Sequence, residues 1–90
     1  MTFTLTKENA NKITKIDNSS VVVIPTGEFS QGDALILFNN SDEFISIQSE
    51  IENTYRSASP KKRKFFEFPP RSLVNAVFID KDILVITAGV

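Results

Sequence analysis

The sequence predicts an all-β domain: a small antiparallel β-sandwich or barrel of about eight to nine short strands. Three observations support this. β-branched and aromatic residues dominate, with ten Ile, seven Val, seven Thr and eight Phe against five Leu and five Ala. Segments rich in these residues are separated by turn-forming clusters. In no stretch of a dozen residues do apolar residues follow the i, i+3, i+4, i+7 spacing of a crossover helix, which argues against a parallel βαβ sheet.

The strands are placed by the turn signals between them. Clusters of Gly, Pro, Asn, Asp and Ser at 17–20, 25–27, 31–33, 39–42, 57–60, 69–70 and 80–82 mark the turns. We therefore expect strands near residues 2–6, 12–16, 20–25, 33–39, 43–48, 52–57, 63–68, 73–79 and 82–87. One short helical turn fits residues 7–12. Gly27 and Gly32 are expected to adopt positive φ in their turns.

Three apolar runs, at residues 21–24, 35–38 and 83–86, lack the alternation of a half-buried strand. Each is therefore expected to be covered on both faces. A domain of 90 residues can cover one face with its own second sheet, so we expect a neighbouring subunit to cover the other. Alternation also places Phe66 and Phe68 on one face and Phe65 on the opposite one.

Composition restricts the chemistry of the chain. The 90 residues suit a single β domain spanning 1–90, and they include no His, no Cys and no Trp. This excludes Ser-His-Asp and Cys-His nucleophile pairs, the usual zinc sites and disulfides. The neighbouring acids Asp42 and Glu43, and likewise Asp80 and Asp82, fit tight turns better than a catalytic pair or a calcium loop. We therefore expect no enzyme activity, no cofactor and no metal.

Targeting and membrane segments are also not expected. The start of the chain lacks a basic region followed by an apolar stretch, and no apolar run approaches the ~20 residues that span a bilayer. We therefore expect synthesis in the cytoplasm and no membrane partner.

Charge is unevenly distributed although the net charge is only −1. Residues 16–55 carry seven acids and no Lys or Arg, whereas residues 56–71 carry six bases and one acid. The candidate partner-contact residues come from the basic part, where cations adjoin an aromatic residue: Lys61, Lys62, Arg63, Lys64, Phe65 and Arg71. Such a run can hold phosphates and stack bases, but it also fits a solvated hairpin or a guard on a sheet edge. We favour docking to an acidic protein surface over nucleic-acid binding.

One long segment has a more specific pattern. In residues 20–41 a valine-rich strand is followed by Pro25-Thr26-Gly27-Glu28-Phe29, then Gly32-Asp33, a second strand and Phe38-Asn39-Asn40-Ser41. Ile45-Ser46-Ile47 follows. This succession resembles bacteriophage virion β-domains, the family of small capsid decoration (cement) proteins and tail-fibre tip domains.

The likeness extends over residues 12–90. Thr54-Tyr55-Arg56 and the closing segments 72–79 and 84–90 are similar to the family's later elements. The loop at 57–71 departs from the pattern, because cations and Pro69-Pro70 stand where glycines and neutral polar residues are expected. The partner surface is therefore expected to differ from that of the family.

The resemblance implies a structural role on a virion. It implies a decoration protein that binds the major capsid protein on the outside of a phage head, stabilises the head through contacts between subunits, and often forms trimers. An initial Met followed directly by strand-like sequence, with no shaft, favours this free-standing role over a tail-fibre or receptor-binding tip. The alternative from another class is a small nucleic-acid-binding β-barrel that uses the basic run.

Overall fold

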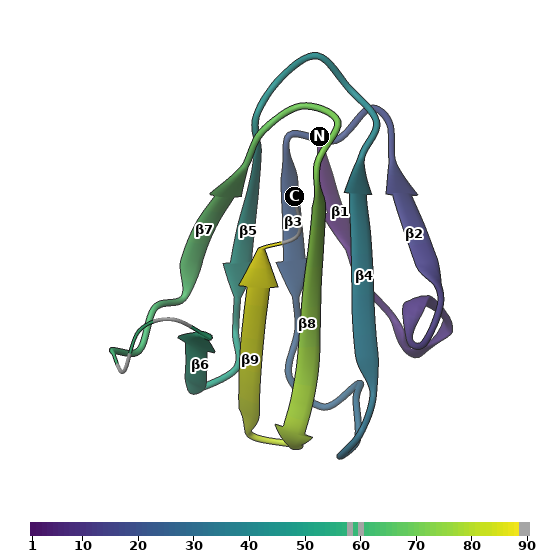
Figure 1. Cartoon of the computed structure of the whole chain (residues 1–90). Helices are drawn as coiled ribbons and strands as arrows, with labels where there is room; N and C mark the ends of the chain where they lie inside the picture. The colour runs from purple at the N-terminus through teal and green to yellow at the C-terminus, as the bar shows by residue number, and fades with distance from the viewer. Residues whose placement is uncertain (58, 60, 89–90) are drawn as a thin grey trace.

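The computed structural model describes residues 1–57, 59 and 61–88, with side chains through residue 87. In this part of the chain, nine strands form two sheets that face each other, with one short 3-10 helix, η1 (Lys7–Asn9), between the first two strands (Figure 1). The four-stranded sheet has the order β1 (Thr2–Thr4), β3 (Val21–Ile24), β5 (Ile45–Ser49), β7 (Phe65–Phe68). The five-stranded sheet has the order β2 (Ile13–Ile16), β4 (Ala34–Asn39), β8 (Leu73–Asp80), β9 (Ile83–Ala88), β6 (Asn53–Arg56).

The nine predicted strands are confirmed, each to within two residues at either end. The helical turn is confirmed as η1, and Gly27 and Gly32 have φ of 81° and 89°. Parts of two expectations lie outside the described residues: positions 58 and 60 of the turn at 57–60, and positions 89 and 90 of the family-like ending.

The prediction of purely antiparallel sheets is wrong, because both sheets are mixed. β1 pairs with β3, β3 with β5, β2 with β4, and β6 with β9 in parallel, whereas β4–β8, β8–β9 and β5–β7 are antiparallel. The cause is a chain that crosses to the other sheet after each of its first seven strands. The crossings between β1 and β6 each reverse direction, so β1, β3 and β5 run the same way, as do β2, β4 and β6, and no crossover helix is required. The crossing from β6 to β7 does not reverse direction, so β7 is antiparallel to β5 (Figure 1).

The alternative of a barrel is also wrong, since the sheets remain separate and pack as a sandwich. Apolar side chains from the inner faces of both sheets, with Leu5, Phe29 and Ile51 from the connecting segments, form one core cluster. Phe68 and Phe78 are among its largest fully buried members. Burying one such side chain contributes about 1.5–3 kcal/mol, so this cluster is the main source of stability.

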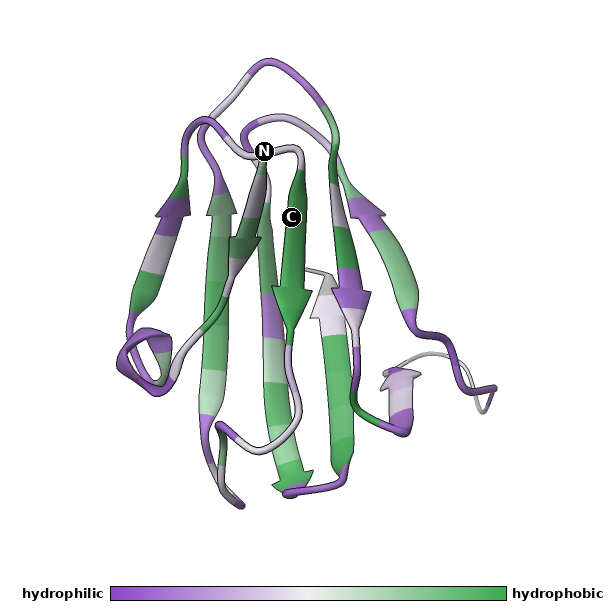
Figure 2. Ribbon diagram, turned by 180° about the vertical axis from the view of Figure 1, so that it is seen from behind, coloured by the Kyte–Doolittle hydropathy of each residue, from purple (hydrophilic) through white to green (hydrophobic). Residues whose placement is uncertain are grey.

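The three apolar runs have one feature in common in the structure. In β3, Val22 and Ile24 enter the core while Val21 and Val23 lie half-buried on the outside of the four-stranded sheet. β4 and β9 repeat this arrangement in the five-stranded sheet, so their outward residues are apolar as well. Figure 2 shows how continuous the apolar character is along these strands. Coverage by a neighbouring subunit stays a prediction.

Asn39 fixes one end of the sandwich. Its side chain is fully buried at the end of β4. The amide nitrogen donates to the carbonyls of Glu43 (2.8 Å) and Pro69 (3.0 Å), and the amide oxygen accepts from the Ser41 hydroxyl (2.6 Å). Because a buried amide is costly unless it is hydrogen-bonded, this network specifies how the turn after β4 meets the turn after β7.

Candidate docking surface at the basic loop

The basic loop, residues Lys61–Lys64, lies between β6 and β7 at the lower left of Figure 1. Its backbone runs back along β6, with an antiparallel bridge between Tyr55 and Lys62. The Arg63 amide donates to the Thr54 carbonyl (2.7 Å), and the Ser49 amide donates to the Lys64 carbonyl (2.8 Å). The loop therefore covers the outer edge of β6 and is attached to both sheets. This is the position of an edge guard.

The side chains of the basic loop lie at the surface of the protein. All four are exposed, as is the neighbouring Arg56 at the end of β6. The Arg63 guanidinium lies 5.6 Å from the centre of the Phe66 ring, a cation–π distance, and its Nε donates to the Phe65 carbonyl (3.1 Å). Within the described chain, Lys61 and Lys62 form no ion pair. Their charges are therefore directed to solvent.

Lys64 has an acidic neighbour. Its ammonium lies 3.3 Å from a Glu52 carboxylate oxygen, and both side chains are largely exposed, at 48% and 72%. An ion pair this exposed contributes about 0–1 kcal/mol to stability, so it can exchange for another partner at little cost.

Phe65 is the aromatic residue beside the basic loop. It is 48% exposed and lies on the outer face of the four-stranded sheet, opposite Gln48 of β5. Phe66 and Phe68 are buried at 5% and 2% exposure, which confirms the predicted opposition of these three residues. A half-exposed phenylalanine next to several cations offers an anchor that an interface can bury.

Arg71 is separated from the other candidates. It lies beyond the far end of β7, in the turn before β8, with φ of 60°. Its guanidinium donates to the side-chain oxygens of Asn40 (2.8 Å) and Asp42 (3.0 Å). The structure thus brings together Lys61, Lys62, Arg63, Lys64 and Phe65, and places Arg71 in a turn–turn contact at the opposite end of the sandwich.

The acids do not gather on one face. Glu52 adjoins the basic loop, whereas Asp42 and Glu43 lie at the other end of the sandwich beside Arg71. The uneven charge along the sequence therefore does not produce a single acidic surface in space. The reason is the winding of the chain between sheets, which sends successive connections to opposite ends.

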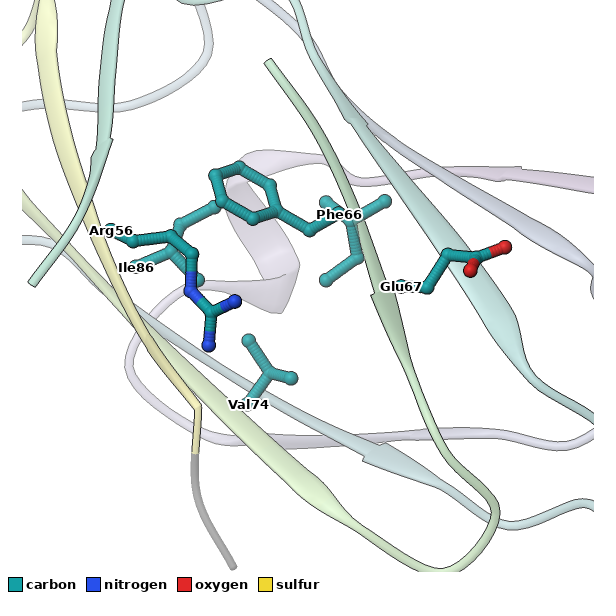
Figure 3. A pocket seen from close by; sticks show the side chains of 6 residues that line it. Arg56, Phe66, Glu67, Val74 and Ile86 are labelled. Atoms are coloured by element: carbon teal, nitrogen blue, oxygen red, sulfur yellow. The ribbon is translucent and has the colours of Figure 1, made fainter. Parts of the chain in front are cut away.

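A shallow pocket lies beneath this region, between β5 and β7 on one side and β8 and β9 on the other (Figure 3). Phe66, Val74 and Ile86 supply apolar walls, the Arg56 guanidinium points toward Val74, and the Glu67 carboxylate points away. Its volume is about 20 Å³, which is room for about one water molecule. It is too small for an organic ligand, so binding in this region is a matter of surface contact.

Arg56 is the member of this surface that sequence reasoning did not select. The signal was present, because Arg56 is the first of the bases after the long acidic stretch. What the sequence could not show is that the loop folds back along β6 and so brings residue 56 beside residues 61–64.

Two further searches bear on this surface. Among the described residues, no group of three or more acidic side chains is placed to hold a metal ion, and no helix is long and apolar enough to cross a membrane. Comparison of the chain with protein-family models, with curated proteins and with solved structures finds no match.

Proposed function

We propose that this protein is a structural binding module of the capsid decoration type, which attaches to the outside of a phage head through the basic loop and Phe65. The observation that carries the proposal is the arrangement at β6 and β7. Exposed cations and a half-exposed aromatic side chain sit on a backbone attached to both sheets. The partner is an acidic surface on the major capsid protein.

The division of roles follows from elementary energetics. Exposed cations steer association and select an acidic partner, while the buried area of an aromatic anchor slows dissociation. Because backbone hydrogen bonds already hold Arg63 and Lys64 in place, little ordering entropy is lost there on binding. A protein that binds only the assembled head stabilises it by mass action, and the effect grows with the number of copies bound.

Copy number tests this proposal. Purified particles of the virus that encodes the chain are analysed by quantitative mass spectrometry against the major capsid protein. A ratio comparable to that of the capsid protein supports decoration. A few copies per particle would assign the chain to a tail or fibre instead, and absence from the particle would overturn the virion role.

Nucleic-acid binding is the second candidate, favoured by the exposed cations of the basic loop next to exposed Phe65. The test is fluorescence anisotropy with single-stranded and duplex oligonucleotides over a range of salt concentrations. Each phosphate contact makes the slope of the log association constant against log salt concentration more negative by about 0.7–0.9. A slope of about −3 that becomes shallower on neutralising Lys61 and Lys62 would support this candidate, and no binding at low salt would remove it.

A further inference from the structure

The outer face of the five-stranded sheet carries exposed apolar side chains on more than one strand. Its exposed members include Ile13 at 67%, Val77 at 41% and Ile79 at 53%. The strand register places further partly exposed apolar or aromatic side chains on the same face: Ala34, Ile36, Phe38, Leu73, Val85 and Tyr55. Two exposed but uncharged polar residues, Asn75 and Thr87, continue the row of Ile13 and Ile36. Contiguous apolar surface of this kind on a small protein marks an interaction site.

The other sheet provides an internal reference. The register aligns two outward rows on the four-stranded sheet: Thr2, Val21, Ser46 and Glu67 in one, and Thr4, Val23, Gln48 and Phe65 in the other. Polar side chains fill most of these positions, as is usual for a sheet face in contact with water. Apolar side chains are therefore more frequent on the five-stranded face, although Phe65 and Phe44, the residue before β5, are also exposed.

Charges lie at opposite ends of this apolar face, along an oblique line from the edge strand β2 to the turn between β8 and β9. Lys15 of β2 adjoins Phe38 in the row at one end of the sheet. Asp80 and Asp82 lie at the other end, in the turn between β8 and β9. Lys81 stands between them, with its ammonium 3.7 Å from an Asp82 carboxylate oxygen, so two acids and one base leave the turn with a net negative charge. Within the described residues Lys15 forms no ion pair. The centre of the face carries no charge.

From this pattern we infer that the outer face of the five-stranded sheet is a homodimer interface with two-fold symmetry. A two-fold axis that lies in the plane of the interface, perpendicular to the line from Lys15 to the acidic turn at 80–82, places Lys15 of each copy over the acidic turn of the other. Both ion pairs then form at once, since a two-fold interface repeats every contact. Rotation about this axis sets the strands of one copy at a large angle to the strands of the other, which is one of the two common ways in which sheets pack.

The size of the face sets the expected affinity. Strands about 4.8 Å apart and side-chain rows spread over about six residues give a footprint of roughly 20 Å by 20 Å. The resulting area of roughly 400 Å² is about half of the ~800 Å² that a standard specific interface buries on each partner, which is the size class of weak, transient association. We therefore expect a dimer with a dissociation constant in the micromolar range. The inference is independent of the proposed function, because it requires only the purified chain.

Sedimentation equilibrium of the full chain, from about 1 μM to about 500 μM, tests the inference in the range where an interface of this size associates. We expect a monomer–dimer equilibrium. Val77→Asp places a charge at the centre of the face and should raise the dissociation constant by at least about tenfold. Val23→Asp is the matched control on the four-stranded sheet and should leave it unchanged. Circular dichroism verifies that both variants are folded.

A charge swap tests the orientation of the two copies. Lys15→Glu and Asp82→Lys should each weaken the dimer. The double variant should restore it, because residue 15 is then negative and the turn at 80–82, with two bases and one acid, has a net positive charge. A monomer throughout the range, a trimer, or a dimer indifferent to Val77→Asp would overturn the interface. A double variant whose dissociation constant is no lower than those of the single variants would overturn this two-fold arrangement.

Discussion

Two loops at the same end of the sandwich use their polar residues in opposite ways. In the loop at 25–33 both acids have partners within the chain. Glu28 accepts from the Lys7 amide (3.0 Å), and the buried Asp33 carboxylate accepts from the Ser30 amide (2.9 Å), from the Asn11 side chain (3.1 Å) and from the Lys7 ammonium. The basic loop leaves its cations in solvent. A loop whose charges are satisfied internally serves the fold, and one whose charges remain outside is available to a partner.

The aromatic residues of the two loops differ in the same way. Phe29 is 7% exposed and stacks on Phe78, with ring centres 5.0 Å apart and planes 23° from parallel. Phe65 is 48% exposed. The sequence presents both as phenylalanines next to charged residues, and only the structure shows which one is structural.

The largest expected effect is on this aromatic pair. Phe29→Ala removes a buried, stacked ring and should lower the free energy of unfolding by about 3 kcal/mol. Phe65→Ala, the matched variant in the other loop, should change it by less than about 1 kcal/mol because the side chain is already half in solvent. Urea unfolding monitored by circular dichroism gives both values, and equal losses would contradict the comparison.

Backbone conformation gives the next effect. Gly32 has φ of 89°, and an added Cβ would meet open space, so the cost of Gly32→Ala is backbone strain alone. We expect a loss of about 1–2 kcal/mol. Ser57→Ala, just before the basic loop, is the control and should be nearly neutral. A neutral Gly32→Ala would show that the loop at 25–33 relaxes without cost.

Asp33 should make stability depend on pH. The Lys7 hydrogen bond, then those from Ser30 and Asn11, lower the pKa of Asp33 from 3.8 to about 2. A carboxyl group with a lower pKa in the folded chain stabilises the fold above its unfolded pKa, and this contribution is lost as pH falls through the folded value. Melting temperatures should therefore fall between about pH 4 and pH 2 more steeply in the parent than in Asp33→Asn. Identical profiles would refute this role.

The smallest expected effect on stability is in the basic loop. Lys61→Gln combined with Lys62→Gln should shift the free energy of unfolding by less than about 0.5 kcal/mol, because both side chains lie in solvent. Thermal unfolding measures this. A loss above about 1 kcal/mol would mean that these cations are structural.

The fold was predictable to the level of its strands but not of their pairing. Turn-forming residues located the nine strands, because Gly, Pro and Asn favour turns whichever sheet the following strand joins. Which strands pair depends on whether a connection returns to the same sheet or crosses to the other. Nothing local to the 25–33 segment, for example, indicates that β4 joins the sheet opposite β3.

The candidate surface was predictable in part for a similar reason. A run of four cations is visible in any sequence, and it proved to be exposed. Arg71 and Asp42, which are 29 residues apart, form a contact that sequence distance conceals. The buried network at Asn39 was also hidden, since an Asn-Asn-Ser sequence is read first as an exposed turn.

Binding of loop variants to phage heads tests the central claim most directly. Heads that lack the protein are mixed with the parent chain, with Lys61→Gln/Lys62→Gln, and with Lys12→Gln/Lys81→Gln, which changes net charge equally outside the loop. Cosedimentation at increasing salt concentration measures affinity. We predict that the loop variant binds more weakly and with less salt dependence, while the control binds like the parent. Equal binding by all three would contradict the assignment of the basic loop as the docking surface.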